Sequence, residues 1–166
     1  MAPSPRLVPL LLPWVALWAQ REQSRALQLG HPLSPEAQKD ASLVGVSQPQ
    51  RIRVLVVPQI QIPRSAFLRQ LGERWGYTSQ TTTGLSLGYG IHLRADCSHD
   101  RELLIHECVH TAQFERLGSL REFLRIYLTD CLVHGYFTSP MEQEARTTAA
   151  ARVQEIRTDN DAADAC

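Results

Sequence analysis

The stretch LLIHECVHTAQ, residues 103–113, places two histidines four positions apart, with a glutamate directly after the first. On an α-helix, positions i and i+4 lie on one face about a turn apart, so His106 and His110 can direct their ring nitrogens toward a common point. With 6 His in the chain, this pattern arises by chance in roughly one such sequence in eighty. The surrounding sequence must therefore decide between a metal-binding helix and a polar helix with two surface histidines.

Glu107 lies about 100° around the predicted helix from His106, close enough to reach a water on a metal without being a ligand itself. Zinc lowers the pKa of such a water toward neutrality and polarises a substrate carbonyl, so a neighbouring carboxylate can act as general base. The motif thus predicts two zinc ligands, His106 and His110, and a base, Glu107. A catalytic zinc site also needs a third protein ligand and one open position.

The third ligand has to come from elsewhere in the chain. No GxxH follows His110, and no NExxSD segment follows at a longer spacing. The segment PMEQEAR, residues 140–146, offers Glu142 and Glu144 in the first turn of a predicted helix. Glu142 also completes a capping box with Ser139, in which its carboxylate would only return to the cap amide. In that case Glu144 would be the ligand, and both candidates stay open at this point.

The two short motifs together carry a resemblance to a known superfamily. EQEA contains the pattern E-x-x-A, which resembles the third-ligand pattern of several glutamate-type zincins. These include membrane CAAX-processing endopeptidases and the regulatory peptidases that cleave phage-type repressors. Only HECVH and EQEA are specific, whereas the order of strand, motif helix, connecting helix and glutamate helix matches as an arrangement over residues 31–166.

The resemblance implies a zinc metallopeptidase, that is, a hydrolase of peptide bonds. It implies one zinc ion per chain, held by His106, His110 and Glu142, with Glu107 as general base acting on a metal-activated water. It also implies a minimal zincin-like α+β fold, in which a small twisted sheet packs on the HExxH helix and two further helices complete the domain. An edge strand just before the motif helix would pair with extended substrate.

The flanking sequence agrees with an α+β fold of two to four strands. One strand is predicted to end at Pro58. A second is predicted to run as a single strand through GLSLGYGIHLR, residues 84–94, with Leu85, Leu87, Tyr89, Ile91 and Leu93 on one face. Its other face, nearly bare at Gly88 and Gly90, would admit another extended backbone. One helix is predicted to end near Gly30, and two others to cover 35–44 and 63–76. The motif helix is predicted to end at Gly118, and the next helix to begin at Ser119. The last helix is predicted to begin at Ser139 and to fray at its C-terminal end.

The first thirty residues allow two interpretations. An apolar stretch from Leu7 to Ala19 follows a single early arginine, which is typical of a signal peptide. Four prolines interrupt the region, and the stretch is too short to cross a bilayer, so no integral membrane span is expected. Residues 1–30 are therefore either an apolar arm that packs on the domain or a cleaved leader. The location stays unknown, with the cytoplasm slightly favoured over export.

Composition limits the partners. The 17 basic and 17 acidic residues cancel without forming blocks, which excludes a nucleic-acid footprint. The expected partner is a peptide or protein substrate, and so short a chain leaves room for a protein that completes the cleft. Two alternatives remain: a non-catalytic zincin-like domain that binds metal or a protein, and a helical interaction protein without metal.

Three other residues carry expectations. His92 is predicted on the open side of its strand, exposed or near substrate. Tyr136 precedes the glutamate helix and can enter the cleft as a hydrogen-bond donor to a developing oxyanion. Gln113, one turn beyond His110, is expected to contact neighbouring polar groups or backbone rather than substrate.

Overall fold

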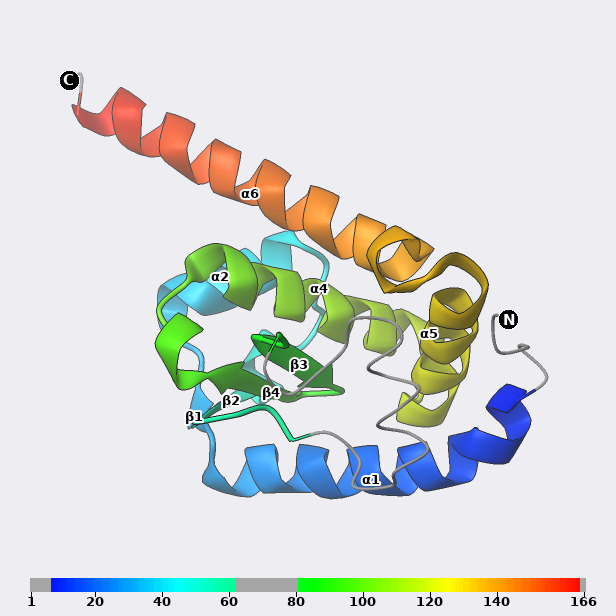
Figure 1. Ribbon diagram of the computed structural model, residues 1–166. Coiled ribbons are helices and arrows are strands. Elements are labelled where there is room, and N and C mark those ends of the chain that lie inside the picture. Colours follow the sequence, from blue (N-terminus) through cyan, green and yellow to red (C-terminus); the bar gives the residue numbers. More distant parts are fainter. Residues whose placement is uncertain (1–6, 62–80, 165–166) are drawn as a thin grey trace.

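In the computed structural model, residues 7–61 and 81–164 are described, and they form three layers (Figure 1). The α-helices among them are α1 (Val8–Leu29), α2 (Pro35–Leu43), α4 (Arg101–Leu117), α5 (Leu120–His134) and α6 (Pro140–Asp164). Helix α1 covers one face of the sheet, whereas α2 and α4 lie over the other. Helix α5 contacts α1 and α4, and α6 crosses α4 on its outer side. The helix predicted over 63–76 lies outside the described residues.

The sheet has four strands in the order β1-β2-β4-β3. Their bounds are β1 (His31–Pro32), β2 (Arg53–Val57), β3 (Gly84–Leu87) and β4 (Gly90–Arg94). Strands β2 and β4 are parallel, and the two outer pairs are antiparallel. The predicted α+β class and the strand that ends at Pro58 are confirmed. Among the described strands, β3 lies at an edge of the sheet, whereas β4, the last strand before the motif helix α4 in sequence, is an inner strand.

The segment 84–94 is a β-hairpin, so the prediction of a single strand was wrong. Leu87 pairs with Gly90, which leaves only Gly88 and Tyr89 for the turn. Gly88 has a φ of 63°, and no non-glycine residue in the described ranges has a positive φ. This combination fits a type II′ turn. A two-residue turn leaves the alternation of apolar and small residues unbroken in the sequence, which is why the pattern resembled one long strand.

The turn also divides the predicted apolar face between the two faces of the sheet. Residues paired in an antiparallel ladder project to the same face. Ser86 pairs with Ile91, and its Oγ lies 3.1 Å from Oγ1 of Thr111 on α4, so this pair faces α4. Leu85 pairs with His92, and this pair faces α1. Both faces of the hairpin are therefore covered by helices.

The expectations for His92 and Gly90 were wrong because α1 occupies their face. His92 is 1% exposed, and its Nε2 donates a hydrogen bond of 3.1 Å to the carbonyl of Glu22. A Cβ at Gly90 would lie 2.9 Å from Cβ of Ala26. The missing side chain therefore admits a helix of the same chain, and not an extended substrate.

Helix α4 ends at Gly118 and α5 begins at Ser119, as predicted, and a side chain caps the start of each helix. Asp100 accepts a hydrogen bond of 3.1 Å from the amide of Leu103, and Ser119 accepts one of 3.1 Å from the amide of Glu122. Gly118 between the helices has a φ of 78°, the left-handed conformation that a glycine adopts without strain. Helix α6 starts as predicted but remains helical to Asp164, beyond the expected fraying.

Helix α1 belongs to the packed structure, and it ends at Gly30 as predicted. Its buried residues Leu12, Val15, Ala16 and Ala19 join one of two apolar clusters, together with residues of β3, α5 and α6. The other cluster lies between the sheet, α2 and α4. The buried side of α1 consists of Val8, Leu12, Val15, Ala16, Ala19 and Ala26. Within the described part of the chain, no helix is both long and apolar enough to cross a membrane.

Candidate metal centre

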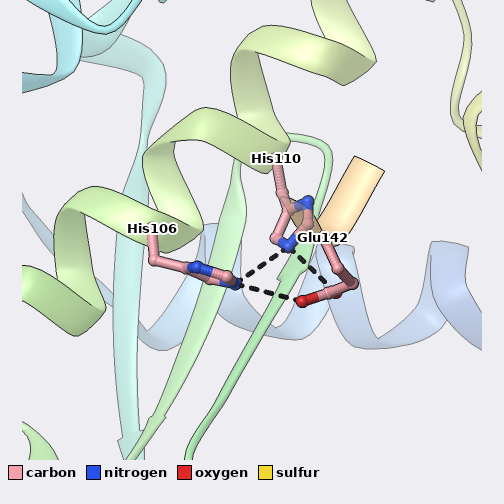
Figure 2. A group of neighbouring side chains, drawn as sticks. All are labelled: His106, His110 and Glu142. Carbon is pink, nitrogen blue, oxygen red and sulfur yellow. Dashed lines mark hydrogen bonds and ion pairs between the residues drawn. The ribbon is translucent and has the colours of Figure 1, made fainter. Parts of the chain in front are cut away.

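Two residues of α4 and one of α6 converge beside the sheet (Figure 2). The Nε2 atoms of His106 and His110 are 3.1 Å apart. His110 Nε2 lies 3.3 Å from Oε1 of Glu142, and His106 Nε2 lies 3.5 Å from Oε2. The structure thus brings together the three side chains that the sequence indicated as a ligand set.

These separations fit a tetrahedral zinc ion. Zinc–nitrogen and zinc–oxygen bonds of about 2.0–2.2 Å at tetrahedral angles put ligand atoms roughly 3.3–3.5 Å apart. The three contacts between the histidines and Glu142 lie close to that range. Two neutral imidazoles and one carboxylate are also a donor set that zinc accepts in catalytic sites, where a fourth position stays open. The residues present therefore fit a zinc ion in both chemistry and spacing.

Gln113 fixes the ring orientation of His110. Its amide nitrogen donates to the carbonyl of Met141 at 2.9 Å and to Oε2 of Glu144 at 3.0 Å. Since both partners only accept, the amide oxygen must face Nδ1 of His110, 2.8 Å away. Nδ1 therefore carries the proton, and in the neutral ring Nε2 presents its lone pair to the centre. The expectation that Gln113 contacts neighbouring polar groups and backbone is confirmed.

The carboxylate of Glu142 faces the histidines rather than its own helix cap. Ser139 Oγ accepts a hydrogen bond of 3.4 Å from the amide of Glu142, which is one half of the capping box. The reciprocal half is absent, because Oε1 of Glu142 accepts 2.6 Å from the hydroxyl of Tyr127 and its Oε2 lies 3.3 Å from Arg146. Glu144 instead forms an ion pair with Arg116 at 2.8 Å, on the protein surface.

Glu107 lies beside the three converging side chains and is 4% exposed. Its Oε2 has no hydrogen-bond partner among the described residues. Burial raises the pKa of this carboxyl, while His106 and His110 act in the opposite direction. The carboxylate occupies the space that a side chain at Gly84 would fill, since a Cβ there would lie 2.8 Å from its Cδ. A buried oxygen without a partner, next to a potential metal site, is suited to hold a water or a proton.

In the metal-free protein, the positive charge of His110 and the negative charge of Glu142 stabilise each other. Burial lowers the pKa of His110, but the hydrogen bond and charge of Glu142 outweigh it and raise the pKa to about 9. Burial raises the pKa of Glu142, but hydrogen bonds from His106 and His110 bring it well below its usual range. A proton shared by these side chains therefore occupies the place that a cation would take.

Two tyrosines border the cluster. Tyr136 lies in the short 3-10 helix η4 (Tyr136–Thr138) and lines the same space as Glu107 and Glu142, as predicted for a residue that enters the cleft. Burial and these two carboxylates raise its pKa, so it keeps its proton. Tyr127 of α5, which donates to Glu142, was not among the residues predicted from the sequence. A tyrosine hydroxyl on an otherwise apolar helix face is the sequence signal that could have indicated its polar role.

An open cleft of about 530 Å³ leads to this centre. The end of β3 near Gly84 lines one side, and α4, η4 and α6 line the other. His106, Glu107 and Glu142 are among its lining residues, so a chain bound in the cleft would lie against all three. None of the protein-family models, curated proteins or solved structures with which the chain was compared matches it.

Proposed function

We propose that this protein is a zinc-dependent metallopeptidase. In this proposal His106, His110 and Glu142 hold one zinc ion, and the chain is a minimal relative of the glutamate-type zincins. The observation that carries it is the pairing of a converging ligand set with a separate, buried carboxylate. A site that only bound metal would have no need of Glu107, whose Oε2 lacks a partner in the described structure.

The bound zinc would polarise the substrate carbonyl and lower the pKa of the attacking water. Glu107 would act as the general base that accepts a proton from the attacking water and as the general acid that donates it to the leaving amine. Its raised pKa suits both steps, because a buried carboxyl retains a proton more readily than an exposed one. Gln113 keeps His110 in the tautomer that a ligand requires, through the 2.8 Å hydrogen bond at Nδ1.

Tyr136 and β3 would position the substrate. Tyr136 keeps its phenolic proton and lines the cleft beside Glu107, so it can donate to the oxyanion that forms on the carbonyl oxygen. Gly84, the first residue of β3, also lines the cleft, and β3 is an edge strand, to which an extended peptide can add main-chain hydrogen bonds.

The ligand set is tested by zinc content, measured on the purified protein and on two matched variants. We expect one zinc per chain in the parent protein, loss of zinc from Glu142→Gln, and full retention in Glu144→Gln. The two glutamates are two residues apart on one helix, so the pair controls for charge and helix stability. Loss of zinc from Glu144→Gln alone would contradict the assignment.

The catalytic part is tested with Glu107→Gln. We expect this variant to keep its zinc and to lose about 10²–10⁴-fold of peptide hydrolysis, the range that general-base catalysis contributes. A peptide mixture followed by mass spectrometry gives the readout. Zinc binding without any cleavage by the parent protein would instead identify a non-catalytic metal-binding domain.

A further inference from the structure

A second cavity, of about 150 Å³, also adjoins the candidate metal centre and is lined in addition by residues that the open cleft does not contact. Apart from the residues of the centre, its walls are almost wholly apolar. Helix α1 contributes one wall with Val8, Leu11, Val15 and Trp18. Helix α5 contributes the opposite wall with residues that include Leu128, and the side chains of Leu85 and Leu87 on β3 close the space between them. We call this space the apolar pocket.

The apolar pocket and the open cleft meet at the proposed catalytic groups. Gly84, His106, Glu107, Tyr136 and Glu142 line both of them. An extended chain lying in the open cleft would therefore pass the proposed catalytic groups where the apolar pocket adjoins them. One of its side chains, next to the bond held at the centre, would enter the pocket.

The size and chemistry of the apolar pocket restrict that side chain. A dry cavity of roughly 150 Å³ lined by apolar side chains binds a molecule of the size of benzene. A large aliphatic or aromatic side chain gains about 1.5–3 kcal/mol from such burial, whereas a charged group would lose its hydration without a partner. Neither α1 nor β3 lines the pocket with a charged side chain that could pair with such a group.

We propose that the apolar pocket is the specificity pocket of this peptidase and takes one large aliphatic or aromatic side chain adjacent to the cleaved bond. This inference rests on the proposed function. It assigns a role to the apolar N-terminal residues: α1, whose sequence resembles the centre of a leader, forms a wall of the substrate site. Val15 of α1 and Leu128 of α5 face the pocket from opposite sides and should therefore control selectivity together.

The first experiment measures binding without catalysis, using toluene as the probe and the methyl resonances of the protein as the readout, with and without zinc. We expect saturable shifts in the parent protein, and at least tenfold weaker binding in Val15→Phe and in Leu128→Phe. Val133→Phe is the matched control, because Val133 lies on α5 but is 54% exposed, outside the pocket. No saturable binding, or equal binding by all variants, would overturn the proposal.

The second experiment compares cleavage products of a peptide mixture. We expect the parent protein to cleave next to large apolar residues, and both pocket variants to shift toward smaller residues, with unchanged zinc content. Zinc-dependent cleavage without this preference overturns the pocket assignment alone. Toluene binding without cleavage of any peptide overturns the proposed function, and leaves the pocket as a site for an apolar ligand.

Discussion

Two buried polar clusters connect α4 to α6, and they are built differently. In the first, described above, Glu142 of α6 meets His106 and His110 of α4. In the second, Asp40 of α2 lies between Arg101 of α4 and Arg152 of α6. Asp40 is 3% exposed and Glu142 is 1% exposed, so both clusters hold a carboxylate away from water.

The difference lies in how completely each cluster is satisfied. Oδ2 of Asp40 accepts two hydrogen bonds from Arg101, and Oδ1 accepts two from Arg152, at 2.7–3.1 Å. Asp40 does not line either of the cavities described above. The Glu142 cluster adjoins Glu107, which has an oxygen without a described partner, and it borders two cavities. In a buried polar cluster that only stabilises the fold, the donors and acceptors are paired with one another. A cluster that binds a ligand keeps some of its donors or acceptors unpaired for that ligand.

The largest expected effect separates the two clusters by stability. Asp40→Ala leaves two arginines without their common partner, and should lower the free energy of unfolding by about 2–4 kcal/mol, a figure reduced because Arg101 is half-exposed. Zinc content should stay at one per chain. Denaturant unfolding and metal analysis provide the measurements. Glu155→Ala, which removes only an exposed partner of Arg152, serves as control. Loss of zinc in Asp40→Ala would show that the two clusters are coupled, and that the Asp40 cluster does not serve stability alone.

A smaller effect is expected from the residue that orients His110. Gln113→Leu removes the hydrogen bond to Nδ1, and should weaken zinc binding about 10–100-fold. Competition with a chelator of known affinity measures the change. Arg116→Ala is the control, because it breaks the surface ion pair with Glu144 but leaves Gln113 in place. Equal losses in both variants would assign the effect to Glu144 rather than to the orientation of His110.

The smallest effect concerns pH. The pKa of His110 is raised from 6.5 to about 9, so its contribution to the stability of the metal-free protein is complete below about pH 6.5 and is lost as the pH rises through 9. Zinc must displace that proton, so its affinity should increase about tenfold per pH unit up to that pKa. Calorimetry in two buffers of different ionisation enthalpy should detect about one proton released per zinc at pH 7. Release of no proton would contradict this linkage.

The parts of the fold that the sequence predicted are those controlled by local structure. Helix boundaries such as Gly118 and Ser119 are set within one turn, and they were found as expected. The hairpin at 84–94 was missed because a two-residue turn preserves alternation, and Gly88 was interpreted as part of a bare face rather than as a turn residue. His92 could not be assigned correctly, since its burial depends on α1, seventy residues earlier in the chain.

In the candidate site, too, the features set by local sequence were predictable and those set by tertiary packing were not. The convergence of His106 and His110 follows from their spacing on one helix. The choice between Glu142 and Glu144 depends on where the first turn of α6 meets α4, which is a tertiary relation that the capping pattern does not contain. The involvement of Tyr127 and Gly84 likewise depends on packing between elements.

The candidate site also depends on Gly84, a residue without a reactive side chain. The carboxylate of Glu107 occupies the space next to Gly84 on β3, so its conformation depends on the absence of a Cβ at residue 84. A single methyl group there would force the carboxylate out of its position while every ligand and every ionisable group stayed in the sequence. A chain that kept HECVH and EQEA but carried alanine at position 84 would thus keep both motifs, yet its Glu107 carboxylate could not occupy the position described here.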